Sequence, residues 1–256
     1  ESVLFEEDNE FVRWLETKSQ KTKNITRLRI SPLDIGESMN KHVYDRFDTI
    51  IMTSATLAVS GIRNWSEFDY LYKRIGLNQC NRKRLRSSIL PAPFNYPKQA
   101  LIGIPTDIPM PDSGSFRNVL QDILKESILI TKGRAFILFT SYSLLNIVYQ
   151  QMLPFFEKEK IIALKQGSEN RHQLLAKFKK DKSSVLFGTD SFWEGVDVPG
   201  EALESVIITK LPFKVPTEPI IEARVEAIQR KGGNAFMEYS LPQAVLKLKQ
   251  GVGRLI

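Results

Sequence analysis

One loop in the sequence gathers side chains that could bind a charged ligand. It follows the apolar run 185–187 and opens with Thr189, and it carries an acid, a glycine and a second acid at Glu194, Gly195 and Asp197. A glycine lets the backbone approach a ligand more closely than any side chain would allow. Hydroxyls and carboxylates can hydrogen-bond to phosphate, ribose or ordered water. The spacing therefore predicts a binding loop directly after a strand.

The last residues of the chain offer a second group of this kind. Gln250 and Arg254 stand four residues apart, around Gly251 and Gly253. A guanidinium group is always charged and matches the geometry of phosphate oxygens. This segment therefore offers a permanent cation, close to two glycines, that could meet an anionic ligand.

Strands and helices alternate along the chain, and this order predicts the framework that positions both segments. We expect strands at 48–57, 100–104, 135–139, 160–163, 185–187 and 205–209, and helices at 116–130, 143–156, 170–180 and 218–230. Alternation of this kind is typical of α/β proteins with a mostly parallel sheet and helices on both faces. Ligands of such sheets bind beyond the carboxyl ends of the strands, where the loop after 185–187 lies.

The two segments together resemble motifs V and VI of superfamily 2 helicases. The sequence Phe-Trp-Glu-Gly-Val-Asp at 192–197 is similar to the corresponding motif of DinG/XPD-type DNA helicases. The resemblance runs from about residue 28 to residue 256. It implies a RecA-like P-loop NTPase fold, in which this chain supplies the second of two motor domains.

In the motif V loop, the resemblance implies a contact between Thr189 and a phosphate of the nucleic-acid strand. Glu194, Gly195 and Asp197 would face the nucleotide, and Asp197 could form an ion pair with the arginine of motif VI. Trp193 could stack on a base or belong to the core, and for its neighbour Phe192 we favour the core.

In the motif VI segment, the resemblance assigns catalytic roles to Gln250 and Arg254 and a nucleotide contact to Gly253. Arg254 would act as an arginine finger that reaches the γ-phosphate once the two motor domains close.

Two further segments resemble helicase motifs that contact the strand. Ser54 and Thr56 lie in the sequence Thr-Ser-Ala-Thr-Leu at 53–57, which resembles motif III; the alternative is an ordinary turn capped by hydroxyls. Thr140 and Ser141 follow the strand 135–139, in a segment that resembles motif IV. Their hydroxyls and the following amides could bind a backbone phosphate, although Ser141 could equally cap the helix.

Some parts of a complete motor are missing from the sequence. It contains neither the phosphate-binding Gly-x-x-x-x-Gly-Lys-Ser/Thr loop nor an Asp-Glu-x-His box. We therefore expect ATP and Mg²⁺ to be bound mainly by the first domain of a longer protein, and this chain alone to be inactive. Cys80 is the single cysteine, so an iron–sulfur cluster held by four cysteines would also lie elsewhere. We expect no metal site in this chain.

Composition sets the remaining expectations. A chain of 256 residues with 42% hydrophobic residues can bury a substantial core, and we place a domain boundary between segments 1–62 and 63–256. The formal net charge of +7 suits a polyanionic partner such as single-stranded DNA. No run of about 18 apolar residues is present, and one cysteine indicates a reducing compartment, so we expect a cytoplasmic protein.

The sequence leaves more than one function open. The leading hypothesis is an ATP-dependent DNA helicase that moves 5′-to-3′ along single strands in DNA repair or replication. The alternative is a nucleic-acid-binding module that has lost motor activity, with or without an attached 3′-5′ exonuclease. An RNA helicase of the wider superfamily is less favoured, because the residues of the motif V and motif VI segments resemble those of the DNA helicases named above.

Overall fold

The computed structural model describes residues 10–19, 24–62, 65–193, 198 and 200–255. The chain forms two compact units, each built from two stretches of sequence. Unit 1 comprises Glu1–Leu90 and Phe213–Leu246, and unit 2 comprises Pro91–Pro212 and Lys247–Ile256. The boundary expected after residue 62 concerns a longer protein and stays a prediction.

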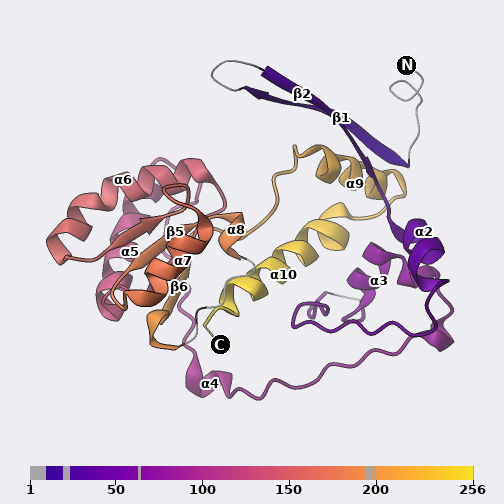
Figure 1. Ribbon diagram of the computed structural model, residues 1–256, viewed down its shortest axis with the longest axis horizontal. Helices are drawn as coiled ribbons and strands as arrows, with labels where there is room; N and C mark the ends of the chain where they lie inside the picture. The colour runs from indigo at the N-terminus through magenta and orange to yellow at the C-terminus, as the bar shows by residue number, and fades with distance from the viewer. Residues whose placement is uncertain (1–9, 20–23, 63–64, 194–197, 199, 256) are drawn as a thin grey trace. The chain divides into compact units, whose positions relative to one another are not determined.

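Unit 2 contains a four-stranded parallel sheet with the strand order β4-β5-β3-β6 (Figure 1). Its strands are β3 (Ala135–Leu138), β4 (Ala163–Lys165), β5 (Val185–Gly188) and β6 (Ser205–Ile208). Ala135 of β3 lies opposite Val185 on one side and Ser205 on the other. The four strands therefore end at one common edge.

Alternate side chains of the strands enter two separate cores, one on each face of the sheet. On one face, Ile137 and Phe187 pack against helices α5 and α6. On the other face, Phe136 and Leu186 pack against α7 and the segment around α8. The period of two along each strand produces this division. It confirms the expected α/β class with helices on both faces (Figure 1).

The helices follow the expected hydrophobic spacing. Phe116, Leu120, Leu124 and Ile128 recur at every fourth position of α5 and are all buried, which is the stripe that a core-facing helix requires. The α-helices are α2 (Gly36–Met39), α3 (Asp69–Ile75), α4 (Tyr96–Gln99), α5 (Phe116–Thr131), α6 (Tyr142–Glu159), α7 (Arg171–Lys180), α8 (Asp190–Trp193), α9 (Pro219–Arg230) and α10 (Leu241–Val252). Short π-helical and 3₁₀ turns are η1 (Asn40–Tyr44), η5 (Phe236–Ser240), η2 (Leu77–Gln79), η3 (Arg82–Arg84) and η4 (Gly200–Ala202). None of the helices in the described ranges is both long and apolar enough to cross a bilayer.

Most of the expected elements are confirmed with small shifts in their bounds. The expected strand 160–163 begins later, at Ala163. Helix α6 continues to Glu159, Lys160 adopts a left-handed conformation with φ of 56°, and the Ile161 amide donates to the Phe156 carbonyl over 3.0 Å. Residues 160–162 therefore form the turn between helix and strand. The two isoleucines in this turn give it the apolar pattern of a strand, and this is why the sequence predicts a strand there.

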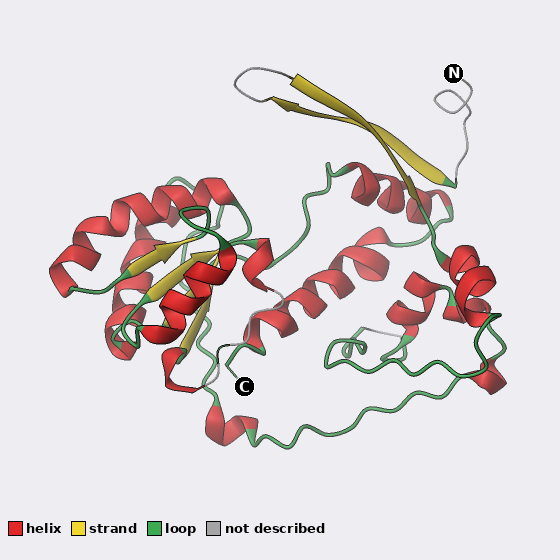
Figure 2. Cartoon of the chain, in the orientation of Figure 1, coloured by secondary structure: helices red, strands yellow, loops and turns green. Residues whose placement is uncertain are grey.

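Two expected strands, at 48–57 and 100–104, are wrong: both segments are loop (Figure 2). Their apolar side chains are open to solvent, and Leu101 is 96% exposed. Neither segment forms a ladder with another strand in the described ranges, and an apolar run without a neighbouring strand has no partner for its backbone groups.

Besides several short helices, the sequence analysis did not predict two strands and the helix α10. The strands β1 (Phe11–Ser19) and β2 (Asn24–Pro32) form an antiparallel hairpin in unit 1. Helix α10 was not anticipated as a helix, although it carries Gln250.

The core of unit 1 joins segments that are distant in sequence. Val59 and Tyr70 pack with Ile221 of α9 and Tyr239 of η5. The Tyr239 ring also lies beneath the guanidinium groups of Arg74 and Arg224, at 5.4 and 5.9 Å from its centroid.

A substitution at Gly133 tests the close packing of the turn that leads into β3. Its φ is 87°, and an added Cβ would lie 2.0 Å from the Ser183 carbonyl oxygen, which is backbone and cannot rotate away. We expect Gly133→Ala to lower the free energy of unfolding by about 2 to 3 kcal/mol, measured by urea denaturation. Gly114→Ala is the matched control, because nothing lies within 4 Å of its added Cβ. Equal stabilities of the two variants would contradict this account of Gly133.

Candidate functional site

The carboxyl edge of the sheet brings together polar residues from three connections. Thr140 and Ser141 follow β3, Gln166 follows β4, and Thr189 follows β5. The Phe139 amide donates to the Gly188 carbonyl over 2.8 Å, which continues the β3–β5 ladder up to this edge. The motif IV and motif V segments therefore meet where the α/β architecture places a binding site.

Gln166 connects these segments through its side-chain amide. Its Oε1 accepts hydrogen bonds from the Thr189 backbone amide at 2.6 Å and from Thr189 Oγ1 at 3.1 Å. Its Nε2 donates to Ser191 Oγ at 2.9 Å and to the Tyr142 hydroxyl oxygen. One side chain thus links the start of α6, the end of β4, the end of β5 and α8.

Ser141 begins α6 as its N-cap. Its backbone is extended, and its hydroxyl oxygen accepts a hydrogen bond from the Leu144 amide at 3.3 Å. Ser141 and its neighbour Tyr142 are exposed, whereas Thr140 is half-buried. The capping interpretation of Ser141 is confirmed, and the remaining amides of the first turn still provide a positive helix end.

Thr189 is buried, in contrast to the exposed Ser141 and Tyr142. It is only 4% exposed, and its hydroxyl bonds to Gln166. Tyr142 and Ser191, which bond to the same glutamine, are exposed residues that carry hydroxyls. A ligand at the carboxyl ends of the β-strands would meet the side chains of these two exposed residues first.

Trp193 requires a correction to the stacking role expected from the sequence. The residue is 0% exposed, and its Nε1 donates to the Phe139 carbonyl oxygen over 3.2 Å. Gly251 packs so closely that an added Cβ would lie 3.0 Å from the indole ring. Trp193 is therefore a core residue with a satisfied polar atom and has no face open to a base. Phe192 is 1% exposed, as favoured from the sequence.

Arg254 ties the end of the chain to the motif V segment. Its guanidinium donates to the backbone carbonyl of Trp193, the last residue of α8. Gln250 and Arg254 are half-buried, and Gly253 is exposed. Glu194, Gly195 and Asp197 lie outside the described residues, and so does the expected ion pair of Asp197 with Arg254.

The motif III residues belong to unit 1. Ser54 Oγ lies 3.1 Å from Thr56 Oγ1 and accepts from the Thr56 backbone amide at 3.2 Å. Ser54 is exposed and Thr56 is half-buried. This segment is a hydroxyl-rich turn, but no strand precedes it among residues 48–53.

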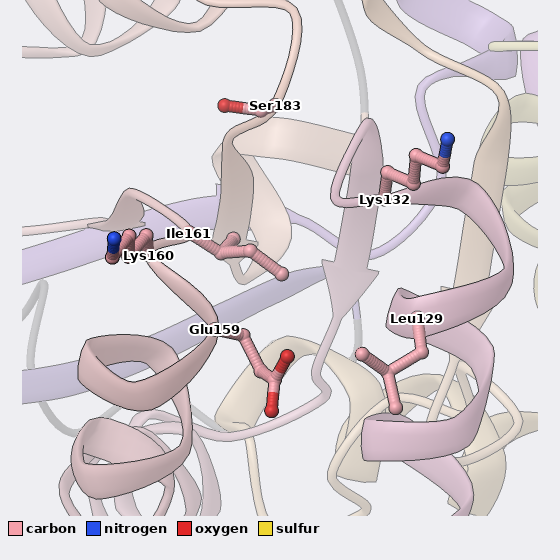
Figure 3. A pocket seen from close by; sticks show the side chains of 6 residues that line it. All are labelled: Leu129, Lys132, Glu159, Lys160, Ile161 and Ser183. Atoms are coloured by element: carbon pink, nitrogen blue, oxygen red, sulfur yellow. The ribbon is translucent and has the colours of Figure 1, made fainter.

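A shallow pocket of about 270 Å³ lies at the opposite edge of the sheet (Figure 3). Lys132, Lys160 and Ser183 line it, and each precedes a strand. Leu129, Glu159 and Ile161 complete the lining. Because this pocket is at the amino ends of the strands, it is separate from the residues that the sequence analysis singled out.

Gln166 and Tyr142 were not recognised from the sequence as site residues. Gln166 follows a short apolar run, and a polar residue directly after a strand is the signal that could have identified it. Tyr142 stands next to Ser141 in the motif IV segment, where the sequence analysis considered only the smaller hydroxyls.

Comparison with known proteins agrees with this geometry. Residues 124–256 match the model of the family described as "Helicase C-terminal domain". The chain is 41% identical to the ATP-dependent DNA helicase YoaA of Haemophilus influenzae over 90% of its residues. It is 38% identical to the ATP-dependent DNA helicase DinG of Photobacterium profundum over 95% of its residues. It is also 31% identical to the 3′-5′ exonuclease DinG of Bacillus subtilis over 100% of its residues.

The chain is much shorter than these relatives. It spans about a third of their length, namely 34%, 34% and 27% of the three proteins in that order. The similarity therefore concerns one part of each relative.

Trp193→Phe tests the packing that holds the two motif segments together. We expect the free energy of unfolding in urea to fall by about 2 to 4 kcal/mol, because the Phe139 carbonyl loses its buried donor and a cavity is left beside Gly251. Trp65→Phe is the matched control, since this half-buried indole stacks under Lys73 at 4.3 Å and the loss there should stay below about 1.5 kcal/mol. A Trp193 variant as stable as the control would show that the buried hydrogen bond contributes little.

Proposed function

Because the chain belongs to the helicase C-terminal domain family, we propose that it is the second, RecA-like motor domain of an ATP-dependent DNA helicase. The observation that carries this proposal is the bond from the Arg254 guanidinium to the Trp193 carbonyl. It joins a cation suited to phosphate with the loop at the carboxyl edge, where the strand-facing hydroxyls gather. A nucleotide contact and a strand contact on one short loop are what a motor requires.

On the nucleotide side, we assign the arginine finger to Arg254 and a supporting catalytic role to Gln250. Gly253 and the loop residues Glu194, Gly195 and Asp197 complete the proposed nucleotide contacts. A guanidinium donates several hydrogen bonds from one plane and keeps its charge at any physiological pH. It therefore fits the developing charge of a γ-phosphate when a partner domain presents one.

On the strand side, Thr189 is buried and donates both its amide and its hydroxyl to Gln166, so it supports this surface from beneath. We assign the contacts with the strand to Thr140 and Ser141 in unit 2 and to Ser54 and Thr56 in unit 1. These residues offer hydroxyls and backbone amides, which bind phosphate oxygens without reading base identity. We accordingly propose single-stranded DNA as the partner, bound without strong sequence preference, and movement in the 5′-to-3′ direction.

The remaining parts of the motor belong to a first domain in the proposed protein. The sequence contains neither the Gly-x-x-x-x-Gly-Lys-Ser/Thr loop nor an Asp-Glu-x-His box, and we therefore assign the phosphate loop and Mg²⁺ to that domain. An iron–sulfur cluster, if the full protein has one, would use cysteines other than Cys80. We place the protein in the cytoplasm and its work in DNA repair or replication.

A second function has one observation in its favour. The Bacillus subtilis relative is named a 3′-5′ exonuclease, and its match extends over the whole of this chain. In that case the chain would bind the DNA strand for a nuclease domain and would not drive movement along the DNA.

Hydrolysis of ATP by the full-length protein separates the two functions. We expect turnover that rises at least about tenfold on addition of single-stranded DNA, because strand binding closes the two motor domains on the nucleotide. The measurement is phosphate release with and without an oligonucleotide. Tight strand binding without any turnover would instead favour the strand-gripping role.

Arg254→Ala tests the assignment of the finger. In the full-length protein we expect ATP turnover to fall about a thousandfold or more, because the charge on the γ-phosphate loses its stabilising cation, while strand affinity stays within about threefold. Arg117→Ala on the exposed face of α5 is the control and should leave both unchanged. Normal turnover by the Arg254 variant would rule out the finger.

A further inference from the structure

The amide of Gln166 uses its full hydrogen-bonding capacity within this one site. A glutamine side chain offers two N–H donors and an oxygen with two lone pairs. Both acceptor positions are occupied by Thr189, and both donor positions are occupied by the oxygens of Tyr142 and Ser191. A fully connected network of this kind holds its members in a single arrangement.

The orientation of the amide follows from the backbone. A backbone N–H can only donate, so the Thr189 amide requires the oxygen of Gln166 as its acceptor, at 2.6 Å. The amide nitrogen must then face the other way, toward Tyr142 and Ser191. Both hydroxyl oxygens therefore act as acceptors toward Gln166.

The direction of the two hydroxyl protons follows in turn. Because the oxygens of Tyr142 and Ser191 accept from Gln166, their own O–H groups remain available as donors on the outer side. Tyr142 is 51% exposed, and Ser191 is exposed as well. The edge of the sheet thus presents two hydroxyl donors, beside the remaining amides at the start of α6.

We propose that Gln166 is a positioning residue, whose amide fixes the Tyr142 and Ser191 hydroxyls as outward donors that bind a phosphate oxygen of the single strand. The proposal rests on the strand-binding function proposed above and deepens it. A phosphodiester oxygen accepts hydrogen bonds and has no proton to donate, so an edge made of donors suits it. The contact is neutral, in contrast to the cationic contact expected of Arg254 with a nucleotide.

Gln166→Glu tests the proposal, because it keeps the shape of the side chain and reverses the direction of the hydrogen bonds. The carboxylate still accepts from the Thr189 amide, but it draws the protons of Tyr142 and Ser191 inward and adds a negative charge. We expect the dissociation constant for a fluorescent oligothymidylate, measured by anisotropy on the full-length protein at about pH 8, to rise about thirtyfold. The KM for ATP should stay unchanged if the phosphate belongs to the strand and not to the nucleotide.

Gln151→Glu is the matched control. Gln151 is exposed on α6 and bonds to Gln121 of α5 at 2.8 Å, outside the Gln166 network. It introduces the same charge in the same unit, and we expect strand affinity to change less than about twofold.

The pH dependence separates positioning from simple structural support. A protonated glutamic acid again donates one hydrogen bond, so the Gln166→Glu variant should regain about fivefold in affinity between about pH 8 and about pH 5, relative to Gln151→Glu. Binding to an anion favours that protonated form, which is why affinity rises as the pH falls. A variant that had only lost its fold would show no such recovery.

Removal of the two hydroxyls completes the test. We expect Tyr142→Phe and Ser191→Ala each to weaken strand binding about threefold to tenfold. The slope of log affinity against log salt should not change, because a neutral donor displaces no counterion, whereas loss of a cationic contact would reduce the slope by about one. In a variant that carries both hydroxyl substitutions, Gln166→Glu should lose the part of its effect that acts through the hydroxyls and keep only the part that comes from its added charge.

The outcomes distinguish this inference from the proposed function. If Gln166→Glu binds the strand as tightly as Gln151→Glu at every pH, or loses binding without recovery at low pH, the positioning role is overturned. A rise in the KM for ATP with strand affinity intact would likewise overturn it, by moving the phosphate to the nucleotide. Absence of DNA-stimulated hydrolysis in the unmodified protein would overturn the motor, and the anisotropy measurements would still decide the role of Gln166.

Discussion

The two-sided pairing of β3 is the constraint on which the candidate site depends. Ala135 lies opposite Val185 on one side and Ser205 on the other, and all three strands run in the same direction. Parallel strands cannot be joined by tight turns, so each connection must cross the sheet and return. The carboxyl ends consequently collect at one edge, and the loops after β3 and β5 start from strands that are buried throughout. Thr189 and Ser141 owe their proximity to this register and not to their positions in the sequence.

Close packing at the sheet extends that constraint to both ends of the strands. At the amino end, Gly133 lies against the Ser183 backbone so closely that no side chain fits. At the carboxyl end, Gly251 lies against the Trp193 ring, and the Nε1 of this ring donates to the Phe139 carbonyl. Both glycines set how near two segments can approach. The segment from the end of β5 to Trp193 therefore rests on a filled core, which suits residues that must hold a fixed geometry.

The sequence predicted the parts of the fold that depend on local pattern. Helix α5 follows from apolar residues at every fourth position, and β3 and β5 follow from short apolar runs. The segments 48–57 and 100–104 have similar runs but are loop, because a strand also needs a neighbour and the local sequence does not show one. Trp193 could have faced a base or the core, and only the surroundings of its indole decide between them. The network of Gln166 escaped prediction because it joins four elements through one side chain.

The bond between Arg254 and the Trp193 carbonyl has a mechanical consequence for the proposed motor. Trp193 ends α8, which begins one residue after Thr189, and Thr189 is held by Gln166 through two hydrogen bonds. A displacement of the guanidinium toward a phosphate would break or pull its bond to α8. Because Ser191 lies in the same short helix, a shift of α8 against Gln166 would also redirect the Ser191 hydroxyl. Coupling between nucleotide and strand needs an element with two arrangements that both ligands bias. In this chain α8 is the element that both proposed contacts share.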